Sequence, residues 1–114
     1  MKSTVRWLAR DCPGCNMENA DLRGADLVAA DLQGANLRGA NLREANLRRA
    51  KLQGANLESA VLEQTNLPGA DLRNTTLRNA NLRGANLIRA DLTGADLRGA
   101  DLSGALLEGA TGIK

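Results

Sequence analysis

The sequence contains no histidine, no phenylalanine and no tyrosine, and Trp7 is its single tryptophan. Histidine is the commonest general base and metal ligand in proteins, so its absence removes the usual centre of a hydrolytic or metal site. Aromatic side chains bury roughly 150–250 Å² each in an ordinary core. A chain of 114 residues with 1% aromatics must therefore build its core from aliphatic side chains in a regular arrangement.

The chain also has no excess of one charge. It holds 15 basic and 13 acidic residues, with a net charge of +2. This balance does not indicate a nucleic-acid or membrane-surface protein. No apolar run approaches the ~20 residues that span a bilayer, and the first residues lack the apolar stretch of a signal peptide. We therefore expect no nucleic-acid or membrane partner and a cytoplasmic location, with the periplasm or thylakoid lumen as the alternative if a leader was removed.

What the sequence does contain is a five-residue repeat. Every fifth residue from Met17 to Leu107 is leucine, apart from Met17 itself, which makes 19 consecutive units. Alanine stands two places before each leucine, except at Cys15, Thr65 and Thr75, and aspartate or asparagine usually lies between them. Neither a helix nor a strand gathers residues five apart on one side. A short extended piece with alanine and leucine inward, followed by a turn, does so, and repeating it winds the chain into an all-β solenoid.

The unit Ala-(Asp/Asn)-Leu-x-x resembles the consensus of the pentapeptide-repeat family, and the match covers residues 15–110. The resemblance implies a right-handed quadrilateral β-helix in which four units close one square turn, which gives about 4.75 coils. Residues 20 apart should then stack on one another. The predicted core ladder of one face is Leu22, Leu42, Leu62, Leu82 and Leu102. The predicted divisions are an N-terminal capping helix and turn (1–14), the β-helix (15–110) and a C-terminal tail (111–114).

Both ends of a solenoid need cover for the core and for unpaired backbone groups. Ser3 can cap a short helix, in which an apolar stripe should seal the first coil; the stripe comprises Val5, Leu8, Ala9 and Cys12. The repeats stop at Ala110, and four residues are too few for a second capping helix. We expect a homodimer through this end, with the alternative that Ala105 to Ile113 folds back as a plug.

Stacking by 20 also predicts the outer surface. One column alternates in charge and reads Glu18, Arg38, Glu58, Arg78 and Arg98. Another column places Lys51 between Asp31 and Asp71. Cross-rung ion pairs on a solvated surface are the expected result for both columns.

One face differs from the others, because aliphatic residues alternate with arginine on it. Its outward column reads Val28, Arg48, Pro68, Ile88 and Glu108, flanked by Arg49, Arg89 and Leu106. Arginine and exposed aliphatic side chains together are typical of an interaction surface. The alternative is a scatter of apolar surface residues without a function.

Cys12-Pro13-Gly14-Cys15 forms a CxxC motif. A thioredoxin-like site places this motif at a helix N-terminus, whereas here it follows the predicted helix. A zinc site needs further cysteine or histidine ligands, which the chain lacks. We therefore expect a structural role, with Cys12 and Cys15 either packed as thiols or joined as a disulfide. The arrangement is similar to that of thylakoid-lumen and cyanobacterial family members, which implies an oxidising compartment.

No constellation of catalytic, cofactor-binding or metal-binding residues emerges from the sequence. We predict that the chain is not an enzyme, uses no cofactor, and serves as a scaffold or protein-interaction module for an unknown protein partner. The resemblance offers one alternative, because quinolone-resistance members of the family mimic B-DNA and bind DNA gyrase. The net charge of +2 and the short rod disfavour it.

Overall fold

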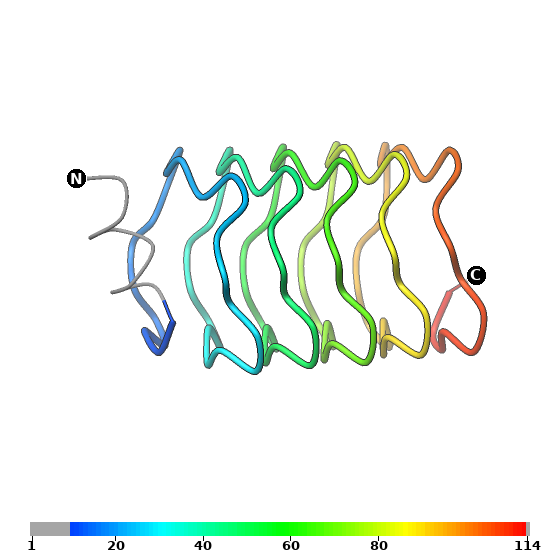
Figure 1. Ribbon diagram of the computed structural model, residues 1–114, viewed down its shortest axis with the longest axis horizontal. Helices are drawn as coiled ribbons and strands as arrows, with labels where there is room; N and C mark the ends of the chain where they lie inside the picture. The colour runs from blue at the N-terminus through cyan, green and yellow to red at the C-terminus, as the bar shows by residue number, and fades with distance from the viewer. Residues whose placement is uncertain (1–9, 114) are drawn as a thin grey trace.

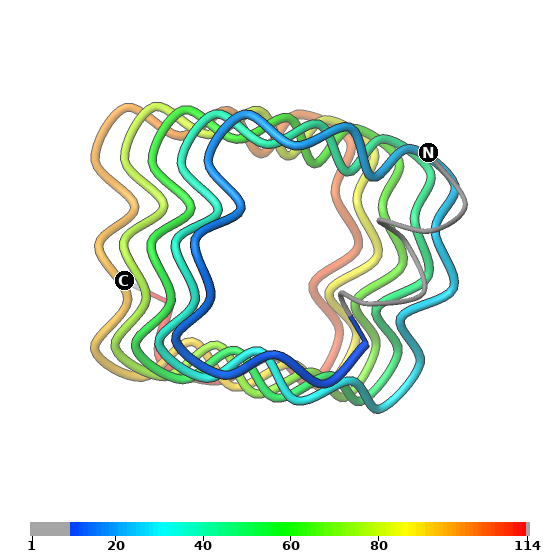
Figure 2. The same cartoon turned by 90° about the vertical axis from the view of Figure 1, so that its left-hand side faces the viewer.

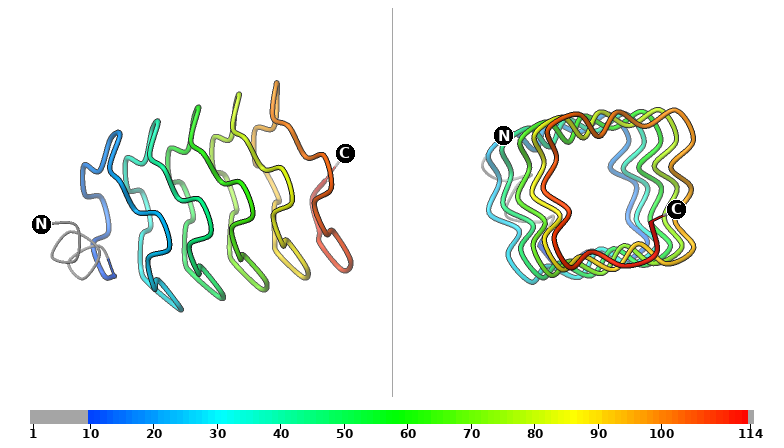
Figure 3. Two further views of the ribbon diagram at one scale, coloured as in Figure 1. Left: turned by 45° about the horizontal axis from the view of Figure 1, so that its top comes forward. Right: turned by 90° about the vertical axis from the view of Figure 1, so that its right-hand side faces the viewer.

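The computed structural model describes residues 10–113, so residues 1–9 of the predicted capping helix, including Trp7, lie outside the described residues. Residues 10–14 of that prediction are not helical. The described chain winds into stacked coils along one axis (Figure 1), and each coil is square when viewed end-on (Figure 3). Viewed from the N-terminal end, the chain runs clockwise as it recedes, which makes the coil right-handed (Figure 2). The molecule measures 38 × 23 × 22 Å along its principal axes.

The coils are joined by isolated parallel β-bridges rather than by longer strands. Each bridge joins a residue to the one 20 positions later, from Asp11 with Asp31 to Asp91 with Thr111. The leucine amide of one unit donates to the next coil, as Leu22 N does to Asn41 O at 2.8 Å. The residue before each leucine donates back to the previous coil, as Asn41 N does to Ala20 O at 2.9 Å. A spacing of 20 residues corresponds to four units of five, so each coil contains four units, as the family resemblance implied.

Consecutive units are joined by tight turns, which form the corners of the square. In one such turn Ala25 N donates to Leu22 O at 3.1 Å, and Gly24, the third residue of the turn, has a φ of 64°. A positive φ at the third residue alone is the signature of a type II turn. Glycine occupies this position in many units, and asparagine, arginine and other residues adopt the same conformation in the rest.

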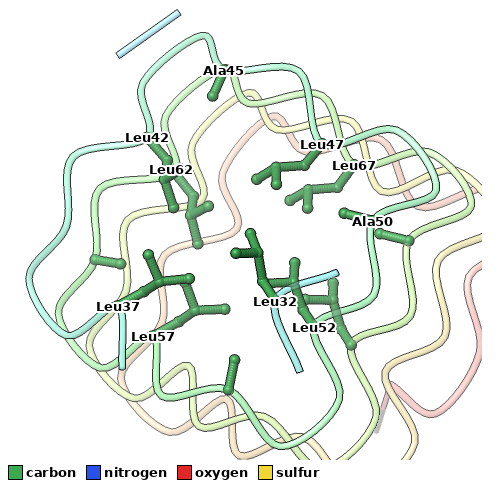
Figure 4. Close-up of a cluster of buried hydrophobic side chains, with 14 of the residues drawn as sticks. Leu32, Leu37, Leu42, Ala45, Leu47, Ala50, Leu52, Leu57, Leu62 and Leu67 are labelled. Atoms are coloured by element: carbon green, nitrogen blue, oxygen red, sulfur yellow. The ribbon is translucent and has the colours of Figure 1, made fainter. Parts of the chain in front are cut away.

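The interior is filled by leucine and alanine, as the repeat predicts. From Leu22 to Leu92 these side chains are at most 1% exposed. Figure 4 shows the pairs Leu42 and Leu62, Leu37 and Leu57, and Leu47 and Leu67 stacked across neighbouring coils. Burial of one leucine contributes about 1.5–3 kcal/mol, so the stacked ladders are the main source of stability.

Two buried threonines replace alanine at the inward position. Thr65 Oγ1 donates to Leu42 O at 2.7 Å, and Thr75 Oγ1 donates to Leu72 O at 2.9 Å. Both hydroxyls are therefore satisfied without water, which removes the cost of burying a polar group in the leucine core.

The ladder extends beyond the predicted range of 15–110 at both ends. Cys12 N donates to Asp31 O at 2.8 Å, so Cys12 occupies the position of a central leucine. Thr111 still bridges Asp91, and Ile113 packs against the core. Between them Gly112 lies so close to the Thr93 backbone that a Cβ atom would clash with it. The homodimer through this end stays a prediction.

No helix among residues 10–113 is long and apolar enough to cross a membrane.

Candidate interaction surface

The square coil gives the rod four faces, which we number in chain order by their central residues. The first carries Cys12, Leu32, Leu52, Leu72 and Leu92; the second Met17, Leu37, Leu57, Leu77 and Leu97; the third Leu22, Leu42, Leu62, Leu82 and Leu102; and the fourth Leu27, Leu47, Leu67, Leu87 and Leu107. On each face the residues before and after the leucine point outward, because side chains alternate along an extended segment.

The second face carries the predicted network of cross-rung ion pairs. Arg38 lies between Glu18 at 3.6 Å and Glu58 at 3.8 Å, and Arg78 lies 3.9 Å from Glu58. At the next rung both Arg78 and Arg98 contact Asp96, at 3.6 and 2.7 Å. The hydrogen bond from Arg98 is the main reason that the pKa of Asp96 falls to about 2. The charges of this face are therefore satisfied within the face.

The first face differs from its prediction, because Lys51 forms no ion pair within residues 10–113. Its column places it between Asp31 and Asp71 as expected. However, Arg73 holds the Asp71 carboxylate with two hydrogen bonds of 2.8 and 2.7 Å, and Gln33 donates to Asp31 at 3.1 Å. The carboxylates are thus engaged by the residue two places later in their own unit. The hydrogen bond from Arg73 also lowers the pKa of Asp71.

The pairing of the arginines separates the fourth face from the rest. The part of the chain from 10 to 113 holds 11 arginines. Eight form ion pairs: Arg10, Arg23, Arg38, Arg43, Arg73, Arg78, Arg83 and Arg98. The other three, Arg48, Arg49 and Arg89, form no ion pair or side-chain hydrogen bond with a described residue. All three lie on the fourth face or at its corner.

The aliphatic residues predicted for this surface lie in register with those arginines. Val28, Pro68 and Ile88 are half-buried in one outward column, and Arg48 separates Val28 from Pro68. Leu106 belongs to the parallel column before the leucines and is 46% exposed. Glu108 ends the aliphatic column and is exposed. The structure thus brings the residues proposed from the sequence together on one face.

Arg49 and Arg89 occupy the corner beside the aliphatic column, where both have a positive φ, of 56° and 61°. Each side chain leans toward a glycine of the following coil. A Cβ atom at Gly69 would lie 3.5 Å from Arg49 Cγ, and one at Gly109 would lie 3.2 Å from Arg89 Cγ. The glycines therefore leave room for the two arginine stems to lie along the edge of the rod.

Asn66 is a residue of this surface that the sequence reasoning missed. Most outward asparagines accept a hydrogen bond from the backbone two residues later, as Asn86 Oδ1 does from Ile88 N at 3.0 Å. Pro68 has no N–H group, so Asn66 lacks this partner and forms no side-chain hydrogen bond with another described residue. The signal was the sequence Asn66-Leu67-Pro68 itself. The exposed amide can donate to a partner and accept from it.

The backbone of the fourth face is already paired between coils. Leu47 N donates to Asn66 O at 2.7 Å, Asn66 N to Ala45 O at 3.0 Å and Gly69 N to Ile88 O at 2.8 Å. A partner therefore cannot add a strand along this face and must contact side chains.

Arg10 closes the amino-terminal end of the same face. Its Nη1 donates to Asp26 O at 3.3 Å, its Nη2 donates to Val28 O at 3.0 Å, and the guanidinium lies 3.7 Å from the Asp26 carboxylate. The guanidinium fork thus supplies two donors to carbonyls that point away from the following coil. Asp26 and Val28 are engaged at this end, which leaves the stretch from Arg48 to Arg89 as the open part of the face.

The two cysteines lie within the first turn of the ladder. Cys12 and Cys15 form a disulfide, with Cα atoms 5.4 Å apart, and Cys15 N also donates to Cys12 O at 3.1 Å. Among residues 10–113 no group of three or more histidine, cysteine, aspartate or glutamate side chains could hold a metal ion.

Comparison with known proteins agrees with this architecture. A family model described as pentapeptide repeats (8 copies) matches residues 11–39, 25–64, 40–79, 55–94 and 70–109. Among solved structures, the chain is similar to a pentapeptide repeat protein from the thylakoid lumen of Arabidopsis thaliana, with 31% identity, a TM-score of 0.54, and coverage of 92% of this chain and 68% of that chain.

It is also similar to a pentapeptide repeat protein from the cyanobacterium Cyanothece 51142, with 32% identity, a TM-score of 0.50 and coverage of 92% of both chains. The comparison with curated proteins found no match. Because the family matches together span residues 11–109, the chain belongs to the pentapeptide-repeat family.

Proposed function

We propose that the protein is a non-enzymatic interaction module that binds a protein partner through its fourth face. The observation that carries this proposal is the distribution of unpaired arginines. Eight arginines of the described part form ion pairs, and the three that do not are Arg48, Arg49 and Arg89, which lie on the fourth face or at its corner. Arginine is enriched at protein interfaces, where its planar guanidinium recognises carboxylates.

The aliphatic residues beside these arginines support the proposal that this face binds a partner. Pro68 and Ile88 are half-buried neighbours in one column, so a partner can cover them with little loss of side-chain entropy. Aliphatic residues at the centre with polar groups around them match the usual anatomy of an interface.

The proposal includes the absence of catalysis. Leucine and alanine fill the interior of the described coils, so a substrate would have to react on an outer face. Many outward carboxylates are held there by turn amides or arginines, as Asp71 is held by Arg73. A general acid or base works best with a pKa near the working pH, whereas the pKa values of Asp71, Asp91, Asp96 and Asp101 are all lowered.

A matched pair of triple variants tests the fourth face. Arg48→Gln/Arg49→Gln/Arg89→Gln removes the three unpaired charges, whereas Arg38→Gln/Arg43→Gln/Arg78→Gln removes three paired ones from the second and third faces. Both variants change the net charge by the same amount. Tagged wild type and both variants are incubated with extract of the source organism, and retained proteins are quantified by mass spectrometry.

The expected result is a protein that wild type and the second variant retain and that the fourth-face variant loses, while circular dichroism shows all three folded. Retention of the same proteins by both variants would contradict the use of this face. Exposed ion pairs contribute about 0–1 kcal/mol each, so the second variant should remain folded.

A further inference from the structure

Four polar side chains at the fourth face and its corner are unpaired among residues 10–113, and together with two aliphatic neighbours they define a patch of six residues: Arg48, Arg49, Asn66, Pro68, Ile88 and Arg89. We propose that this patch binds an acidic amphipathic helix of a partner protein, laid along the axis of the rod. This inference rests on the proposed function and names the chemistry of the partner. It follows from the charge of the patch, its saturated backbone and its spacing.

The positive charge of the patch indicates a partner that supplies carboxylates. Three guanidinium groups have no anionic partner among residues 10–113, and Glu108 is the one unpaired acid in the outward columns of the described fourth face. A guanidinium binds a carboxylate with two parallel hydrogen bonds. The exposed amide of Asn66 supplies a further donor and acceptor on the opposite side of the aliphatic column.

A nucleic acid fits the patch less well. Residues 10–113 hold 12 basic and 13 acidic side chains, patch included, so the described rod as a whole carries no excess of positive charge. Phosphate backbones bind through many cationic contacts, and single strands bind by stacking on aromatic rings. The described residues include no aromatic side chain, and the centre of the patch is aliphatic.

The paired backbone groups of the fourth face and the distance between Arg49 and Arg89 favour a helix as the partner segment. An added strand would need free N–H and C=O groups, which the ladder of the fourth face already uses, as in the 2.8 Å bond from Gly69 N to Ile88 O. Arg49 and Arg89 lie two coils apart, which is roughly 10 Å at the usual spacing of neighbouring strands. Seven residues of a helix advance about 10.5 Å and return to the same side. Two acids seven positions apart therefore match Arg49 and Arg89.

The residues three and four places after the first acid face the same side of the helix as the two acids. Aliphatic residues there would lie over Pro68, in the coil between the two arginines, and over Ile88, next to Arg89; both are half-buried. The expected recognition pattern is thus an acid, two aliphatic residues three and four places later, and a second acid seven places after the first.

The test uses a fluorescein-labelled synthetic helical peptide with this pattern, titrated with the full chain and followed by fluorescence anisotropy. A second peptide carries lysine in place of both glutamates, and a third has the same composition in scrambled order. A DNA duplex of about two helical turns, long enough to span the patch, is titrated in parallel. The protein variants are the fourth-face and the matched triple arginine variants described above.

We expect the acidic peptide to bind wild type and the matched variant equally, and the fourth-face variant roughly tenfold more weakly or worse, since several exposed charge pairs are lost. Binding should also weaken with added salt. The inference is overturned if the acidic peptide does not bind, if the lysine or scrambled peptide binds as well, or if only the duplex binds through these arginines. Should the peptide fail while the natural partner is still lost by the fourth-face variant, the proposed function stands and the helix is wrong.

Discussion

At the scale of single residues, the main conformational constraint is the positive φ required at the position two places after each leucine. Every such residue from Gly14 to Gly109 has a positive φ, whether it is glycine or not. An L-residue in this region costs about 1–2 kcal/mol relative to the right-handed conformation, whereas glycine avoids most of that cost. The repeat tolerates other residues there because the ladder on both sides of the turn holds the conformation.

Two substitutions, one that removes a glycine and one that introduces a glycine at this position, test the cost of the positive φ. Gly34 has a φ of 67°, and a Cβ atom added there would meet no other atom within 4 Å, whereas Ala29 has a φ of 57°. We expect Gly34→Ala to lower the free energy of unfolding by about 1 kcal/mol and Ala29→Gly to raise it by a similar amount. Denaturant unfolding measures both. Changes of the same sign in the two variants would contradict this explanation.

Acid–arginine pairs within one unit are the second residue-scale feature. Asp96 accepts hydrogen bonds from Arg98 at 2.9 and 2.7 Å, which lowers its pKa to about 2. The pKa of an unfolded aspartate is about 3.9, so the ionised form favours the folded state. The resulting stabilisation is fully present above about pH 4 and is lost as the pH falls toward about 2.

The Asp96→Asn variant should therefore show a smaller loss of melting temperature than wild type between about pH 5 and pH 2. Asparagine keeps the turn hydrogen bond, as Asn36 Oδ1 does by accepting from Arg38 N at 3.1 Å. The variant therefore removes the charge and one of the two hydrogen bonds from Arg98, while the turn is retained. Differential scanning calorimetry at several pH values gives the comparison. Parallel profiles for wild type and variant would show that Asp96 does not contribute to the acid sensitivity.

At the scale of the coil, stability comes from stacking one leucine on the next. Leu62 is 1% exposed in the middle of the third-face ladder, and Leu102 is partly exposed at its end. Leucine-to-alanine changes in a closed core cost about 2–5 kcal/mol, partly because a cavity remains. A cavity beside Leu102 is open to solvent, which reduces that cost.

Leu62→Ala should thus lower the free energy of unfolding by about 2–5 kcal/mol and Leu102→Ala by clearly less. Leu62→Asp should be more severe, because its carboxylate would be buried without a partner. Thermal and denaturant melts of the variants provide the measurement. Equal costs for Leu62→Ala and Leu102→Ala would be inconsistent with a closed central ladder.

The coil could be predicted from the sequence to the extent that each unit dictates its own geometry. Leucine at every fifth residue requires inward alternation and a turn, whereas the count of four units per coil came from the family resemblance. Side-chain pairing was less predictable, because Lys51 faces aspartates that their own units already engage. Asn66 was missed because its exposed amide depends on the missing N–H group of Pro68. The ladder position of Cys12 was hidden by the change from leucine to cysteine.

At the scale of the whole molecule, the four faces share one backbone and differ in how their charges are used. Ion pairs tie down the arginines of the first three faces, as Arg38 does between Glu18 and Glu58. On the fourth face and its corner, Arg48, Arg49 and Arg89 form no ion pair with another described residue, and they lie beside a half-buried aliphatic column. The fourth face therefore differs from the other three in how its arginines are paired, and this difference is the basis of the proposed recognition.

The most direct test of this use of the fourth face is a comparison of the four faces within one coil. A photo-crosslinking amino acid is placed in turn at Gln53, Glu58, Glu63 and Pro68, which occupy equivalent, half-buried positions on the first to fourth faces. After irradiation in extract of the source organism, crosslinked products are identified by mass spectrometry. We expect a specific adduct from position 68 that is lost when Arg48, Arg49 and Arg89 are changed to glutamine. Equal adducts from all four positions, or a specific adduct from another face alone, would contradict recognition through the fourth face.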